Sequence, residues 1–196
     1  MKSLALITSI LICLLMKAQP TDTSVFYQIP DAPESYAPGN ILTRMVDGLG
    51  YRYYWASNEL TTADLAYKPS ESGKSCLETM EHIYELSVAI ETIASGEVCI
   101  RPYPVIDLEY EELRHQTLAN FWVARNAFLN QTEEEIEKRK VVFQNGENKS
   151  EFPFWNFING QLSDAIYHTG QIVVFRRANG NPINSNVRVF SGVNAK

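Results

Sequence analysis

Asp164 and His168 are the residues whose types and spacing point most directly to chemistry. They lie four residues apart in the segment SDAIYHTGQIVVFRR, so on a helix both side chains project from the same face, one turn apart. Carboxylate oxygen and imidazole nitrogen are both ligands of divalent metal ions. The pair therefore predicts half of a metal site.

A second helical segment, CLETMEHIYELSVAIETIA, supplies His82. This histidine shares a side of the predicted helix with Leu86, Ala89 and Ile93, so we expect its imidazole to point at least partly inward. If the two helices pack together, His82 completes a three-ligand site. Three protein ligands leave coordination positions for water or substrate, as a catalytic metal requires. A core histidine that binds no metal is the alternative interpretation.

Several neighbours of these residues are candidates for supporting roles. Gln171 lies one turn beyond His168 and is predicted to hold a metal ligand by a hydrogen bond. Glu78 and Glu85 flank His82 at the i−4 and i+3 positions. Either glutamate is a candidate outer partner or general base, although ordinary solvated carboxylates are the favoured alternative.

Two further groups of residues are interpreted as structural. Arg176 and Arg177 fall near the predicted end of a helix, where positive charge complements the helix dipole, and we expect them at the surface. The tryptophans are most simply core or boundary aromatics, although any of them could line a pocket. They are Trp55, Trp122 and Trp155.

Apolar residues at three- and four-residue steps predict four helices. The predicted ranges are 41–57, 76–94, 107–131 and 153–179. Ser75 and Glu78 predict a capping box at the start of the second helix. Pro102 and Pro104 lie in a connection long enough to cross a bundle. Residues 133–140 predict a solvated helical extension, and residues 141–146 a small hairpin or a loop. The fold class is therefore all-α, a four-helix bundle.

The N-terminus predicts export. Residues 1–19 contain an apolar run that is short for a membrane span and are interpreted as a signal peptide; an uncleaved anchor is the alternative. Residues 20–40 form a leader to the domain at 41–180, and residues 181–196 a polar tail. The mature protein is expected to be secreted or periplasmic, with no stable membrane insertion. Its formal charge, −6 before cleavage and −8 after losing two lysines, argues against nucleic-acid binding.

Cys76 and Cys99 are the cysteines that remain after cleavage. They lie near opposite ends of the second predicted helix, roughly 30 Å apart, whereas a disulfide needs Cα atoms within about 7 Å. We therefore predict two free or buried thiols.

The pattern around these residues resembles the DinB-like superfamily. The loop K-P-S-E-S-G-K-S precedes E-H-I at His82, and H-T-G-Q-I-x-x-x-R-R-x-x-G begins at His168. The resemblance covers residues 41–180. It implies an up-down-down-up bundle, with a long crossover between helices 2 and 3 and a divalent metal between helices 2 and 4. His82 and His168 match the first and last metal histidines of the family, whereas Asp164 stands where the family has a histidine.

What the resemblance implies about function is broad, because the superfamily includes the YfiT-like group, some thiol-dependent transferases and members without known activity. We expect a metal-dependent hydrolase or thiol-dependent transferase acting on a small molecule. The alternative is a non-catalytic binding or stress-related module with a degenerate metal site. Zinc or nickel is the expected metal, with iron and manganese as alternatives, and Asp164 either changes the metal preference or weakens the site. A homodimer is in keeping with related bundles.

Overall fold

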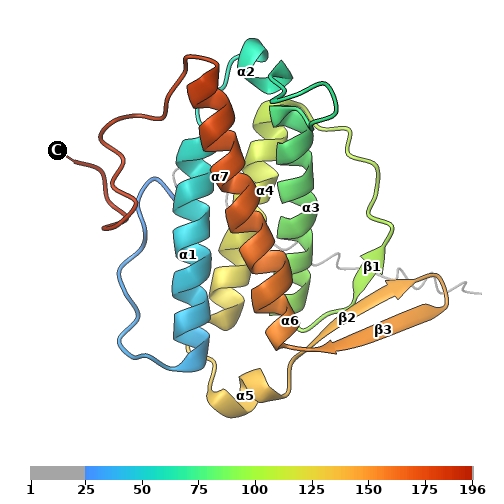
Figure 1. The fold of residues 1–196 in the computed structure, drawn as a ribbon. Coiled ribbons are helices and arrows are strands. Elements are labelled where there is room, and N and C mark those ends of the chain that lie inside the picture. Colours follow the sequence, from blue (N-terminus) through green and yellow to red (C-terminus); the bar gives the residue numbers. More distant parts are fainter. Residues whose placement is uncertain (1–24, 196) are drawn as a thin grey trace, which may run out of the picture.

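Four long helices form the body of the molecule, and their apolar faces meet between them. The computed structural model describes residues 25–195, which are mostly helical with a small three-stranded sheet (Figure 1). The long helices are α1 (Pro38–Ser57), α3 (Cys76–Ala94), α4 (Tyr110–Phe128) and α7 (Ser163–Ala178). Helices α1 and α3 each contact both α4 and α7. The two predicted halves of the metal site, on α3 and α7, therefore lie on neighbouring helices.

The starts of helices α1 and α3 follow from the residues at their N-terminal ends. Helix α1 starts at Pro38, inside the predicted leader, because proline is well suited to the first helical position. The expectation that Pro38 belongs to a non-helical leader was wrong. Helix α3 has the predicted bounds, and its capping box is confirmed: Ser75 Oγ accepts from the Glu78 amide at 3.1 Å, and Glu78 Oε2 accepts from the Ser75 amide at 2.6 Å.

The middle of the chain is more broken than predicted. Helix α4 ends at Phe128, and Asn130 adopts a positive φ of 63° shortly afterwards. The predicted extension at 133–140 is therefore a separate short helix, α5 (Glu133–Glu137). A further short helix, α2 (Thr62–Ala66), occupies part of the connection expected to be irregular.

Three short strands correct the all-α prediction. They are β1 (Cys99–Arg101), β2 (Lys140–Asn145) and β3 (Asn148–Pro153). Strands β2 and β3 form the hairpin that was predicted as one alternative, with Gly146 at positive φ in the turn. Strand β1 pairs in parallel with β2. It is short and far from its partner in sequence, so no local pattern predicts the pairing.

The predicted fourth helix, 153–179, contains a change of helical type. It consists of α6 (Trp155–Phe157), a π-helical segment η1 (Ile158–Leu162), and α7. The Ser163 hydroxyl donates to the carbonyl of Ile158 at 2.6 Å, and the backbone amide of Ser163 donates to the same carbonyl, five residues earlier. This is the π-helical spacing, which is often found beside functional residues. It lies directly before Asp164.

Arg176 is buried and joins two helices, whereas we expected it at the surface. Its side chain is 3% exposed, and its Nη1 donates to the carbonyls of Trp55, Ala56 and Asn58 at 3.0, 3.1 and 2.9 Å. These carbonyls lie at the C-terminal end of α1, where the helix leaves its acceptors unpaired. Arg177 is exposed, as predicted. Arg176 thereby ties the end of α7 to the end of α1.

Both described cysteines are free and buried, which confirms the prediction against a disulfide. Burial raises the pKa of each thiol to about 11. A buried, protonated thiol is a poor nucleophile. Cys76 and Cys99 are therefore core residues.

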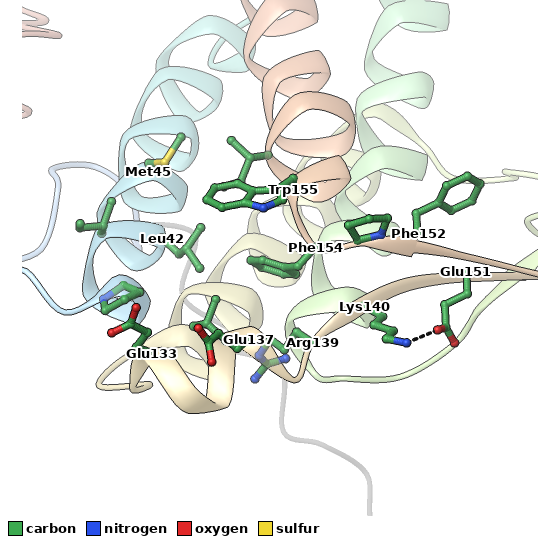
Figure 2. A pocket seen from close by; sticks show the side chains of 15 residues that line it. Leu42, Met45, Glu133, Glu137, Arg139, Lys140, Glu151, Phe152, Phe154 and Trp155 are labelled. Carbon is green, nitrogen blue, oxygen red and sulfur yellow. Dashed lines mark hydrogen bonds and ion pairs between the residues drawn. The ribbon is translucent and has the colours of Figure 1, made fainter.

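A cavity lies at the end of the molecule where α1 begins. It measures about 730 Å³ and lies between α1, α5 and the segment joining β3 to η1 (Figure 2). Trp155 lines it and is 73% exposed, whereas Trp55 is 8% exposed and belongs to the core.

The ends of the chain complete the description. The tail after α7 is irregular, as predicted, and returns to the body, since Ile29 N donates to Gly192 O at 2.7 Å. The predicted signal peptide, 1–19, lies outside the described residues. Within residues 25–195, no helix has both the length and the apolar character needed to cross a membrane.

Candidate metal centre

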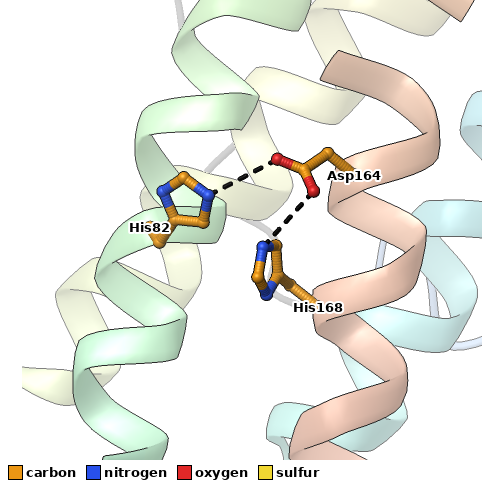
Figure 3. Close-up of side chains that lie close together, drawn as sticks. All are labelled: His82, Asp164 and His168. Atoms are coloured by element: carbon orange, nitrogen blue, oxygen red, sulfur yellow. Dashed lines mark ion pairs between the residues drawn. The ribbon is translucent and has the colours of Figure 1, made fainter. Parts of the chain in front are cut away.

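The structure brings together all three predicted ligands. His82 extends from α3, and Asp164 and His168 extend toward it from α7 (Figure 3). His82 Nε2 lies 3.5 Å from Asp164 Oδ2, and His168 Nε2 lies 3.4 Å from Asp164 Oδ1. One ligand atom from each residue falls within 4.8 Å of the other two.

The packing of α3 against α7 sets this arrangement. Ile83 on α3 and Ala165 on α7, each next to a candidate ligand, are fully buried. The candidate ligands themselves lie at the edge of the helix contact, with side-chain exposures of 28% for His82, 44% for Asp164 and 18% for His168. The site is thus held by a rigid interface and remains open to solvent on one side.

An oxygen lies near the other ring nitrogen of each imidazole. His168 Nδ1 lies 2.8 Å from Gln171 Oε1, which confirms the predicted support. This hydrogen bond favours a proton on Nδ1 of His168 and leaves its Nε2 lone pair directed at Asp164. His82 Nδ1 lies 3.6 Å from Glu85 Oε2, close enough for a charge contact but too far for a hydrogen bond.

Glu78 does not join this arrangement. Its carboxylate caps α3 and lies 3.2 Å from Lys68 Nζ. The hydrogen bond with the Ser75 amide and the Lys68 ammonium lower the pKa of Glu78 to about 2. Of the two glutamates flanking His82, only Glu85 faces the imidazole.

The donor set fits a divalent cation. Two Nε2 lone pairs and one carboxylate converge, and the gaps of 3.4 and 3.5 Å between nitrogen and oxygen exceed normal N–H···O hydrogen bonds. A cation would satisfy all three groups at once. Two nitrogen ligands and one oxygen ligand suit zinc and also non-haem iron, and three protein ligands leave further coordination positions free.

Tyr167 is a neighbour of the site that the sequence analysis missed. Its ring lies 5.2 Å from the His168 ring in an edge-on arrangement, and 64% of the residue is exposed. Its position next to His168 in the sequence could have identified it, because the rings of adjacent residues on a helix can touch.

Comparison with solved structures finds a similar fold. A DinB-like protein, YjoA, from Bacillus subtilis matches with a TM-score of 0.51 over 70% of this chain and 92% of that chain. The fold is DinB-like. Sequence identity with YjoA is 15%, so the likeness concerns the DinB-like fold, while the roles of individual residues rest on geometry. No family model matches this chain, and neither does any curated protein sequence.

The three candidate ligands of this DinB-like fold line neither of two cavities found in residues 25–195. The larger is the cavity beside Trp155. The smaller, about 190 Å³, is polar and lies near Arg176 and Asn181. The candidate ligands therefore occupy the surface edge of the contact between α3 and α7.

Proposed function

We propose that this protein binds one divalent metal ion through Nε2 of His82, the carboxylate of Asp164 and Nε2 of His168, and that it is a metal-dependent hydrolase acting on a small molecule. One observation carries the proposal. Both Nε2 atoms and the carboxylate converge, while Gln171 accepts at Nδ1 of His168 and the Glu85 carboxylate lies near Nδ1 of His82. This is the arrangement that prepares neutral histidines for a metal.

A bound divalent cation would supply Lewis-acid chemistry, lowering the pKa of a water molecule or a substrate thiol. The protein's own residues would bind the ion and fix its surroundings. Gln171 orients the imidazole of His168, and Asp164 and the nearby Glu85 contribute negative charge. Because Cys76 and Cys99 are buried, a thiol-dependent transferase, the other reaction class that we propose, would need a thiol from its cosubstrate.

The metal is proposed to be zinc or nickel, with iron and manganese as alternatives. Zinc is supported by the two imidazoles. Iron is supported by the combination of two histidines with one carboxylate, which is the facial triad of non-haem iron sites. Asp164 in place of a third histidine favours harder cations relative to an all-histidine site.

The architecture that we propose is the up-down-down-up bundle of DinB-like proteins. It is supported by the contacts of α1 and α3 with both α4 and α7, and by a connection at 95–109 that lets α3 and α4 run the same way in Figure 1.

We also propose that the mature protein is secreted or periplasmic, that it does not bind nucleic acid, and that it pairs as a homodimer. Export is supported by the apolar run at 4–16, and the lack of nucleic-acid binding by the negative net charge.

A second candidate is a non-catalytic DinB-fold binding module with a degenerate site. One observation favours it: the three candidate ligands are partly exposed at the edge of the contact between α3 and α7, and they line neither the cavity of about 730 Å³ nor that of about 190 Å³. An enzyme with this site would bind its substrate at an open surface, beside Tyr167.

The first test is metal content, measured by elemental analysis of protein purified without a histidine tag. We expect near-stoichiometric metal in the wild type, loss in His168→Ala, and retention in His115→Ala, the matched control at the remaining histidine. Equal metal content in the two variants, or no metal after reconstitution, would overturn the proposal.

Thermal unfolding provides a second readout. Added metal should raise the Tm of the wild type and leave that of Asp164→Ala unchanged, because only a folded, intact site gains binding energy. Metal-dependent turnover of an ester and amide panel, lost in Asp164→Ala, would then separate the hydrolase from the binding module.

A further inference from the structure

The cavity beside Trp155 has the size and surface of a binding site, and nothing in the metal site uses it. Its volume of about 730 Å³ lies within the usual range for small-molecule pockets. The apolar walls come from both sides of the cavity, with Leu42 and Met45 on α1 facing Trp155 and Phe154 (Figure 2). The exposed indole of Trp155 gives an apolar ligand a large surface to cover.

Three of the charged side chains in the cavity already have partners. Lys140 pairs with Glu151 across the hairpin. Arg139 donates to the carbonyls of Ile93 and Ala94 at 3.2 and 2.6 Å, and therefore closes the end of α3. Neither cation is available to an anionic ligand without breaking an existing contact.

The remaining charges are the carboxylates of Glu133 and Glu137. They lie one turn apart on α5, so they project from the same side of that helix. Both line the cavity. Figure 2 shows them below the apolar side chains of Leu42 and Trp155. The cavity thus has an apolar part and, beside it, two carboxylates without a basic partner in the cavity.

We propose that this cavity binds a hydrophobic organic cation, an amine with an aromatic or aliphatic body. The body would lie against Leu42, Met45 and Trp155, and the ammonium group would lie near Glu133 and Glu137. Charge complementarity selects the cation over an anion of the same shape. Apolar burial supplies most of the affinity, and the exposed carboxylates add a smaller, salt-dependent part.

Three probes that differ only in their polar end test the charge selection: 4-phenylbutylamine, 4-phenylbutan-1-ol and 4-phenylbutyrate, measured by calorimetry and by tryptophan fluorescence. At low salt we expect the amine to bind about tenfold more tightly than the carboxylate, with the alcohol between them. Added salt should reduce the difference. Failure of all three to bind, or equal binding of amine and carboxylate, would overturn the proposal.

Matched variants locate the site. Replacing both carboxylates, by Glu133→Gln with Glu137→Gln, should remove the preference for the amine and leave alcohol binding unchanged. Glu134→Gln is the control, because Glu134 lies on the same helix and pairs with Lys138 at 2.6 Å outside the cavity. If the control removes the preference as fully as the double variant does, the proposed location is wrong.

Trp155→Ala should weaken the binding of all three probes. Trp155 is exposed, and circular dichroism checks that the variant is folded. His168→Ala should bind the amine as the wild type does, so this proposal and the metal-site proposal can be tested independently.

Sedimentation tests whether a second copy of the chain occupies the cavity instead. A wild-type dimer that Trp155→Ala converts to monomer, together with no amine binding, would assign the cavity to a second copy of the chain and overturn the proposal.

Discussion

Nδ1 of His168 lies 2.8 Å from Oε1 of Gln171, one turn further along α7. An amide oxygen can only accept a hydrogen bond, so this contact places the imidazole proton on Nδ1 and leaves Nε2 free to bind a metal. Gln171 therefore decides which nitrogen of His168 faces Asp164. A residue that need not touch the metal would thus control one of its ligands.

Gln171→Ala should lower metal affinity by roughly 10- to 100-fold, because the imidazole loses the partner that fixes its orientation. Competition with a metal chelator measures the change. Gln171→Glu should retain most of the affinity, since a carboxylate also accepts from Nδ1. Gln116→Ala is the control, because Gln116 is half-buried on α4 and bonds Glu112, away from the candidate ligands. An affinity unchanged in Gln171→Ala would show that the contact does not position a ligand.

Arg176 and Arg177 should differ sharply in their effect on stability. Arg176→Ala removes a buried guanidinium and leaves the carbonyls at the end of α1 without their donor, so we expect the free energy of unfolding to fall by about 3 kcal/mol. Arg177→Ala should change it by less than about 0.5 kcal/mol. Urea unfolding of both variants gives the comparison, and similar losses would contradict the internal role of Arg176.

Asp64 predicts an acid-sensitive contribution to stability. Burial alone would raise the pKa of this carboxyl, but hydrogen bonds from Asn179, Asn181 and Thr61 outweigh it and lower the pKa to about 2. A folded-state pKa below the unfolded value means that the stabilisation is complete above about pH 4 and is lost as the pH falls toward 2. It amounts to about 2 kcal/mol.

The measurement for Asp64 is urea unfolding of the wild type and Asp64→Asn at pH 6 and pH 2.5. The wild type should lose about 2 kcal/mol more than the variant over this interval. Equal losses would show that the carboxylate is not stabilised in the folded state.

Cys76 and Cys99 should resist thiol reagents in the folded protein. Both are buried, and burial raises the pKa of each to about 11, so very little thiolate exists near neutral pH. With Ellman's reagent at pH 8 we expect slow labelling of these two thiols in buffer and fast labelling in urea. Fast labelling in buffer would place at least one thiol at an accessible position.

The sequence predicted the elements and residues that have strong local signals. Helix α3 and its capping box follow from the spacing of apolar residues and from Ser75 with Glu78. The four-residue step between Asp164 and His168 predicts a shared helix face without knowledge of the fold. Joining His82 to that pair required the resemblance to DinB-like proteins, because nothing local to α3 indicates which helix it contacts.

The features that were missed depend on contacts between distant segments. The parallel pairing of β1 with β2 has no pattern in the three residues of β1. Arg176 and Arg177 are adjacent and identical in type, and only the approach of α1 distinguishes them. The cavity likewise arises where α1, α5 and the end of β3 meet, so Trp155 alone does not reveal it.

The π-helical segment η1 affects how this chain is to be aligned with others. A π turn holds about one residue more than an α turn. Because each residue advances an α-helix by about 100°, the extra residue changes which later positions share a helix face. An alignment with a relative whose corresponding helix is α-helical throughout needs a one-residue gap within Ile158–Leu162. Without that gap, an alignment anchored on Trp155 would place Asp164 and His168 one position out of register and hide the ligand pair.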